Sequence, residues 1–249
     1  MRRSVLLLSC ALLAPIGCAS IEPGDVSSVA LPSDTAARSG NVYLIRGFLG
    51  IFSTGIDRLG SEISAAGVRA SVFQDDQWSN VADAIARKET TSLYHEPLVL
   101  VGHSYGADDA IRIARELKKR NVQVDLLITL DPVTPPPVPM NVRQCINLYQ
   151  SNGVWDTFPW LRGVPLGCER ESDATQLINA NLRVDRTDLF EPGLDHFNIE
   201  KKQKVHDEIL QHVLNTCPAR SAYATRPLTP VLARPDPGRG TKLAPAART

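Results

Sequence analysis

The stretch PLVLVGHSYGADDAIRIAREL, residues 97–117, combines the patterns of a buried strand, a sharp turn and an amphipathic helix. Residues 98–102 are apolar or small and follow a proline, which is typical of a strand buried in a parallel sheet. From Ala107 to Leu117 the apolar residues recur at helical spacing, with charged residues between them. The chain is therefore expected to turn from strand to helix within residues 102–106, around Ser104.

These five residues, Gly102-His103-Ser104-Tyr105-Gly106, form a G-x-S-x-G pattern. The two glycines remove the side chains that would collide in a tight turn. A serine on such a turn projects its Oγ above the strand ends, and the helix that follows directs N–H groups toward developing negative charge. The pattern resembles the nucleophile elbow of the α/β hydrolases.

The resemblance covers roughly residues 41–214, and within the family the chain looks most like the compact thioesterase or lipase-type members. It implies an α/β-hydrolase fold of the α/β class, with a mostly parallel sheet flanked by helices on both faces and no large cap domain. The absence of a bound cofactor is also implied, because acyl transfer to water uses only side chains and backbone donors.

The partners of Ser104 follow from the family order of serine, acid and histidine. Among the five histidines, His196 lies in a loop just before the last expected helix and is the predicted base. Asp131 follows the strand expected at residues 122–130 and is the favoured acid, because thioesterase-like members place it there. Asp156, after the next strand, is the alternative acid.

The oxyanion hole is expected to use two backbone N–H groups, those of Phe48 and Tyr105. Arg46 stands where the family often has a histidine, but a backbone donor does not depend on that side chain. Asp108 and Asp109, in the first turn of the elbow helix, are interpreted as complementing the helix dipole and solvent.

Further strands are expected at residues 41–45, 68–73 and 142–150, and helices at 54–66, 78–93 and 199–214. Residues 151–195 have poor periodicity, which suggests a lid or binding loop. Their aromatic cluster could equally line an acyl pocket or form a small satellite core; it contains Trp155, Phe158, Trp160 and Leu161.

The composition argues for one domain and against a nucleic-acid binder. A chain of 249 residues with 43% hydrophobic content can bury one sizeable core. From Cys18 to Cys217 there are 19 Lys and Arg against 26 Asp and Glu, a net charge of −7. Nucleic-acid binding needs a basic face, which this excess of acid does not supply.

The N-terminus has the layout of a bacterial export signal. Arg2 and Arg3 precede an apolar run that is too short to span a bilayer, and Gly17-Cys18 follows it as in a lipoprotein signal. We expect a signal peptide at 1–17, a tether at 18–39, the hydrolase domain at 40–217 and a disordered tail at 218–249. Lipidation of Cys18 would anchor the protein in the cell envelope and provide its membrane contact.

Export also bears on the remaining cysteines. Cys145 and Cys168 are expected to form a disulfide in an oxidising compartment, which leaves Cys217 as a thiol. No cysteine has the neighbours of a zinc site, so no metal is expected.

The sequence thus predicts a serine hydrolase acting on a small-molecule or lipid ester or thioester. Two other hypotheses stay open: a catalytically silent surface lipoprotein that uses the fold as a binding module, and an amidase using the same residues.

Overall fold

The protein is described by a computed structural model that covers residues 22–31, 35–48, 54–92, 95–151, 157–158, 163–170 and 174–223. Its centre is a six-stranded sheet in the order β2-β1-β3-β4-β5-β6, with every neighbouring pair parallel. The strands are β1 (Asn41–Ile45), β2 (Arg69–Phe73), β3 (Leu98–His103), β4 (Val124–Leu130), β5 (Val142–Tyr149) and β6 (Gln176–Asn181).

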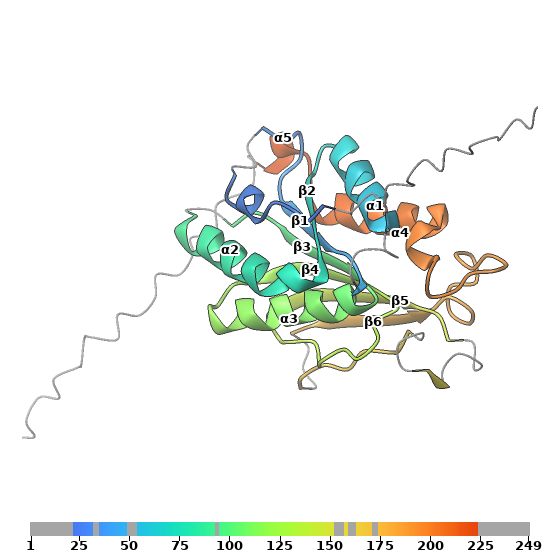
Figure 1. Cartoon of the computed structure of the whole chain (residues 1–249). Coiled ribbons are helices and arrows are strands. Elements are labelled where there is room, and N and C mark those ends of the chain that lie inside the picture. Colours follow the sequence, from blue (N-terminus) through green and yellow to red (C-terminus); the bar gives the residue numbers. More distant parts are fainter. Residues whose placement is uncertain are drawn as a thin grey trace, which may run out of the picture.

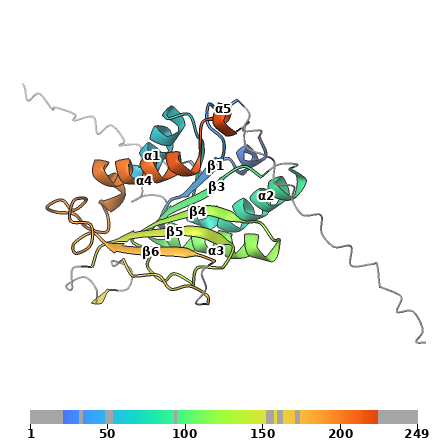
Figure 2. The same cartoon turned by 180° about the vertical axis from the view of Figure 1, so that it is seen from behind.

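Helices cover both faces of this sheet. α2 (Trp78–Thr91) and α3 (Tyr105–Lys119) lie on one face, and α1 (Thr54–Ala65) and α4 (Gln203–Thr216) lie on the other (Figure 1). The view from behind shows the same two layers (Figure 2). Each face has its own apolar core, and β3 is buried along its whole length, which explains its unbroken run of apolar residues. The predicted fold class is confirmed, and no cap domain is present among the described residues.

The order of the strands determines where a site can form. From β1 the chain moves outward to β2, and from β3 it moves outward in the opposite direction to β4. The carboxyl ends of β1 and β3 therefore flank a topological switch point, where open α/β sheets bind their ligands. Ser104 follows the last residue of β3 at this place.

Several elements differ from the sequence-based expectation. β6 lies within the stretch that shows no periodicity, because it is a polar edge strand rather than a buried one. The last helix is divided into a 3-10 turn, η6 (Ile199–Lys201), and α4. Within the predicted tether, the 3-10 helix η1 (Val26–Ala30) buries Val29, and α5 (Arg220–Tyr223) begins beyond the predicted end of the domain.

The predicted disulfide is not formed. Cys145 and Cys168 are both free thiols, as is Cys217. Cys145 is fully buried within β5, where burial raises the pKa of its thiol, and Cys168 lies in an isolated bridge with Val138. The segment before His196 is held by other contacts, described below. Among the described residues, no helix is both long and apolar enough to span a bilayer.

Candidate active site

Ser104 lies on a strained turn between β3 and α3. Its backbone has φ 57° and ψ −127°, a conformation that non-glycine residues rarely adopt. A Cβ on Gly102 would lie 2.1 Å from the carbonyl oxygen of Gly106, and a Cβ on Gly106 would lie 2.3 Å from that of Arg46. The two glycines therefore allow the start of α3 to contact both β3 and the end of β1.

Three side chains form a hydrogen-bonded row at this turn. Ser104 Oγ is 2.9 Å from His196 Nε2, and His196 Nδ1 is 3.3 Å from Asp131 Oδ2. An ionised carboxylate can only accept, so Nδ1 carries the proton and Nε2 is left to accept from the serine hydroxyl. All three side chains are buried, so the row is shielded from most of the solvent. This is the arrangement in which a histidine can remove the serine proton.

Asp131 is held in place from several sides. It has φ 46°, a positive value that aspartate tolerates better than most residues. Its N–H donates to the Leu148 carbonyl at 3.0 Å, and its Oδ1 accepts from the Gln150 N–H at 2.7 Å. Gly163 packs directly against the carboxylate. Burial raises the pKa of Asp131, while the His196 imidazole and the Gln150 N–H lower it.

The histidine loop is fixed by its own polar residues. The Asp195 N–H donates to Asn198 Oδ1, and the Asn198 side-chain amide donates to the Gly193 carbonyl at 2.9 Å. His103, the neighbour of Ser104, donates from Nε2 to the His196 carbonyl, also at 2.9 Å. Burial lowers the pKa of His103 to about 3, so it is a neutral donor that supports the base.

The expected oxyanion donors lie on adjacent segments. Phe48 follows β1 and Tyr105 begins α3, and the centroids of their rings are 6.1 Å apart. Arg46 is buried and forms a forked ion pair with Asp57 in the first turn of α1, with both oxygens 3.1 Å from its Nε. This pair ties the start of the oxyanion loop to the helix that follows it.

Several predicted residues lie outside the part of the chain that the structure describes. Asp156, the alternative acid, lies outside the described residues, as do Cys18 and the aromatic residues Trp155, Trp160 and Leu161. Phe158 is described and is 44% exposed.

The interpretation of Asp108 and Asp109 as solvated residues was wrong. Both are buried, Asp109 in an ion pair with Arg112 and Asp108 against the loop that begins with Asp131. The sequence signal that was available is their position: Asp108 follows Ser104 by one helical turn, on the side of α3 that faces the protein.

The other histidines and possible metal ligands offer no competing site. His206 is buried between Glu62 and the Glu200 carbonyl, at 2.7 Å from each, and His95 pairs with Asp125 at 2.8 Å. Hydrogen bonding to Asp125 and Glu89 raises the pKa of His95 to about 10. Over the described part of the chain, no group of three side chains is placed to hold a metal ion.

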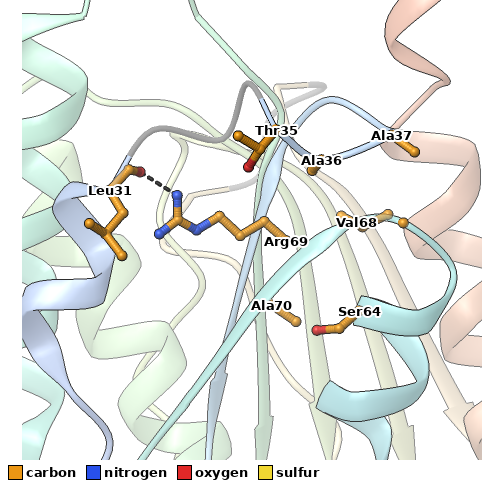
Figure 3. Close-up of a pocket in the computed structure, with 9 residues that line it drawn as sticks. Leu31, Thr35, Ala36, Ala37, Ser64, Val68, Arg69 and Ala70 are labelled. Carbon is orange, nitrogen blue, oxygen red and sulfur yellow. Dashed lines mark hydrogen bonds between the residues drawn. The ribbon is translucent and has the colours of Figure 1, made fainter.

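A cavity of about 470 Å³ lies at the opposite end of the sheet (Figure 3). It is lined by residues before β1 and around the start of β2, including Ala37, Val68 and Arg69. Arg69 extends across it, and its guanidinium donates to the carbonyls of Leu31 and Ser28. Ser104 follows the carboxyl end of β3, so this cavity is remote from the row of three side chains.

Comparison of this chain with known proteins finds similar solved structures but no similar sequence family. No family model and no curated protein matches it. Among solved structures, Est1E from Butyrivibrio proteoclasticus is 12% identical and aligns over 74% of this chain and 92% of its own, with a TM-score of 0.41. A cutinase-like protein from Cryptococcus sp. is 16% identical over 71% and 94%, with a TM-score of 0.42. The NocB thioesterase domain from the nocardicin cluster is 14% identical over 70% and 93%, with a TM-score of 0.43.

Proposed function

We propose that this protein is a serine hydrolase that cleaves a carboxylic ester or thioester through an acyl-enzyme on Ser104. The observation that carries the proposal is the row in which Ser104 Oγ lies 2.9 Å from His196 Nε2 and His196 Nδ1 lies 3.3 Å from Asp131. The row occupies a strained turn at the switch point of a parallel sheet, where α/β enzymes place their chemistry.

The chemistry follows from these groups. Ser104 Oγ attacks the acyl carbon while His196 Nε2 takes its proton, and Asp131 stabilises the imidazolium that results. The N–H groups of Phe48 and Tyr105 bind the oxyanion of the tetrahedral intermediate. His196 then gives the proton to the leaving alcohol or thiol. In the second half of the reaction, water attacks the acyl carbon while His196 takes its proton. The bond to Ser104 Oγ then breaks, His196 returns the proton to Oγ, and the carboxylic acid is released. Every step uses side chains and backbone donors of this chain.

The exposed aromatic side chains at the rim of the site favour a substrate with an apolar group. Phe48 is 55% exposed and touches the Tyr105 ring, and Phe197 is 43% exposed and packs edge-on against the His196 ring at 5.6 Å. Large apolar side chains at the surface carry a hydration cost that burial against a ligand removes. A small-molecule or lipid ester with an aliphatic or aryl acyl group fits this rim.

A fluorophosphonate probe tests the proposal directly, because it phosphonylates a serine whose hydroxyl is activated by a neighbouring base. The wild-type protein should be labelled, and Ser104→Ala should be neither labelled nor active. A panel of p-nitrophenyl esters of increasing acyl length, with matched thioesters and amides, then identifies the bond that is cleaved. Folded wild-type protein that stays unlabelled would instead support the binding-module hypothesis.

We also propose, from the sequence alone, that the chain is exported and anchored through Cys18. Metabolic labelling with a palmitate analogue in a bacterial host should modify the wild type and leave Cys18→Ala unmodified. Equal incorporation in both would contradict the assignment.

A further inference from the structure

Asp108 lies four residues after Ser104 on α3, and its carboxylate reaches the loop that begins with Asp131. Its Oδ1 accepts from the Val133 N–H at 3.1 Å. Its Oδ2 accepts from the Thr134 N–H at 2.8 Å and from the Thr134 hydroxyl at 3.1 Å. One buried carboxylate therefore receives three donors from a single loop, with no exposed surface of its own.

These contacts matter because the loop starts from an unfavourable backbone conformation. Asp131 has φ 46°, and such residues persist only where the surrounding structure holds them. On the strand side, Leu148 and Gln150 hold Asp131 through its N–H and Oδ1. On the far side of Pro132, the hydrogen bonds of Asp108 hold the next two residues.

We propose that Asp108 is a positioning residue for the row of Ser104, His196 and Asp131. Its hydrogen bonds connect the loop that begins at Asp131 to the helix that begins after Ser104. The Asp131 carboxylate is thereby held within hydrogen-bonding distance of His196. The inference rests on the proposed function, because it assigns Asp108 a part in that chemistry without contact with the substrate.

Burial raises the pKa of Asp108, and the donors from Thr134 and Val133 act against this rise. A carboxylate that is removed from water needs such donors to remain charged. Removing one of the two acceptor oxygens of Asp108 should therefore loosen the loop, because among the described residues no other carboxylate accepts a hydrogen bond from Val133 or Thr134.

The test compares Asp108→Asn with Asp109→Asn. Asparagine has one acceptor oxygen and an NH₂ group, so it cannot accept from both Val133 and Thr134. We expect kcat to fall about 10- to 100-fold with KM changed less than about twofold, since small displacements of a catalytic group act on the reaction step. Asp109 is the matched control, because it is a neighbouring buried aspartate that pairs with Arg112. Asp109→Asn should keep the wild-type kcat.

A spectroscopic readout separates positioning from general destabilisation. We expect the proton between His196 Nδ1 and Asp131 to give a downfield NMR resonance, which should shift or broaden in Asp108→Asn and stay in place in Asp109→Asn. An unchanged resonance, or equal losses of kcat in both variants, would overturn the proposal.

A second pair of variants covers the case in which Asp108→Asn does not fold. Thr134→Val removes only the hydroxyl bond and should lower kcat a few-fold, whereas Thr134→Ser keeps that bond and should retain kcat. Equal kcat in the two Thr134 variants would then refute the proposal. If the wild type is not labelled by a fluorophosphonate, the proposed function fails instead, and the resonance still reports whether Asp108 positions Asp131.

Discussion

Replacing Gly163 with alanine should displace the acid of the proposed triad. Gly163 is buried, and a Cβ at this position would lie 2.1 Å from Asp131 Oδ1 and 2.8 Å from Tyr149 Cβ. The first distance is about 1.3 Å shorter than the 3.4 Å at which ordinary van der Waals contact begins. Either the carboxylate or the segment that covers it has to move.

The size of the effect follows from that overlap. Asp131 is tied to Leu148 and Gln150, and the Val164 N–H on the covering segment donates to the Pro132 carbonyl at 3.2 Å. A shift of about 1 Å in a catalytic group costs about 100-fold in rate, which corresponds to about 2.7 kcal/mol in activation free energy. Overpacking of this kind also lowers the free energy of unfolding by about 1–3 kcal/mol.

The assay is the second-order rate constant of fluorophosphonate labelling, measured beside kcat on the best ester and the thermal unfolding midpoint. Gly167→Ala is the matched control, because it lies four residues later on the same segment and its added Cβ would meet nothing within 4 Å. Wild-type labelling of folded Gly163→Ala would refute the reasoning. An equal loss in Gly167→Ala would also refute it, because the effect would then not arise at Asp131.

Three other substitutions test separate parts of the structure. Asp131→Asn should lower kcat by about 10⁴-fold, because the amide favours the wrong tautomer of His196; near-normal kcat would point to Asp156 as the acid. Arg46→Met should lower kcat/KM about 10- to 100-fold by releasing the oxyanion loop from Asp57, since a charge-assisted pair contributes about 1.5–3 kcal/mol; Arg46→Lys should lose less, and equal loss in both would contradict this reading. Burial raises the pKa of Glu200 to about 7, so the folded state holds a proton that the unfolded state releases near pH 4.5. The stability that Glu200 contributes is therefore present below about pH 4.5 and lost as pH rises through about 7. The unfolding midpoint of Glu200→Gln minus that of the wild type should therefore increase between pH 5 and pH 8. A difference in midpoint that stays constant over this range would show that Glu200 stays charged.

The sequence was informative where a local pattern has one physical solution. The strand, the glycines and the helix around Ser104 specify a sharp turn, and the turn is present at the predicted residues. Asp131 and His196 could be selected because each lies next to a recognisable element and because the chain resembles hydrolases in which the acid and the histidine occupy these places, although Asp156 stayed open as the alternative acid. The structure brings both into hydrogen-bond range of the row that starts at Ser104.

Other features depended on partners that are distant in the chain. β6 is polar because Asn179 pairs with Asn147, and both bind the segment of residues 163–166 through its backbone. A pattern search that expects alternating apolar residues does not find such a strand. Asp108 was misread for the same reason, since a charged residue in a helix is normally solvated and its donors lie 25 and 26 residues away.

Two strained backbone positions favour the enzyme hypothesis over the binding-module hypothesis. Ser104 and Asp131 have φ values of 57° and 46°, and each such residue costs about 1–3 kcal/mol in folding free energy. Strain of this kind clusters at functional sites, where the surrounding structure holds it in place. At these two positions it accompanies the contacts of Ser104 Oγ and the Asp131 carboxylate with the two ring nitrogens of His196. The buried carboxylate of Asp108 binds the loop that starts at Asp131, and Gly163 packs against the Asp131 carboxylate, so these features converge on one row of side chains. That convergence favours chemistry at Ser104.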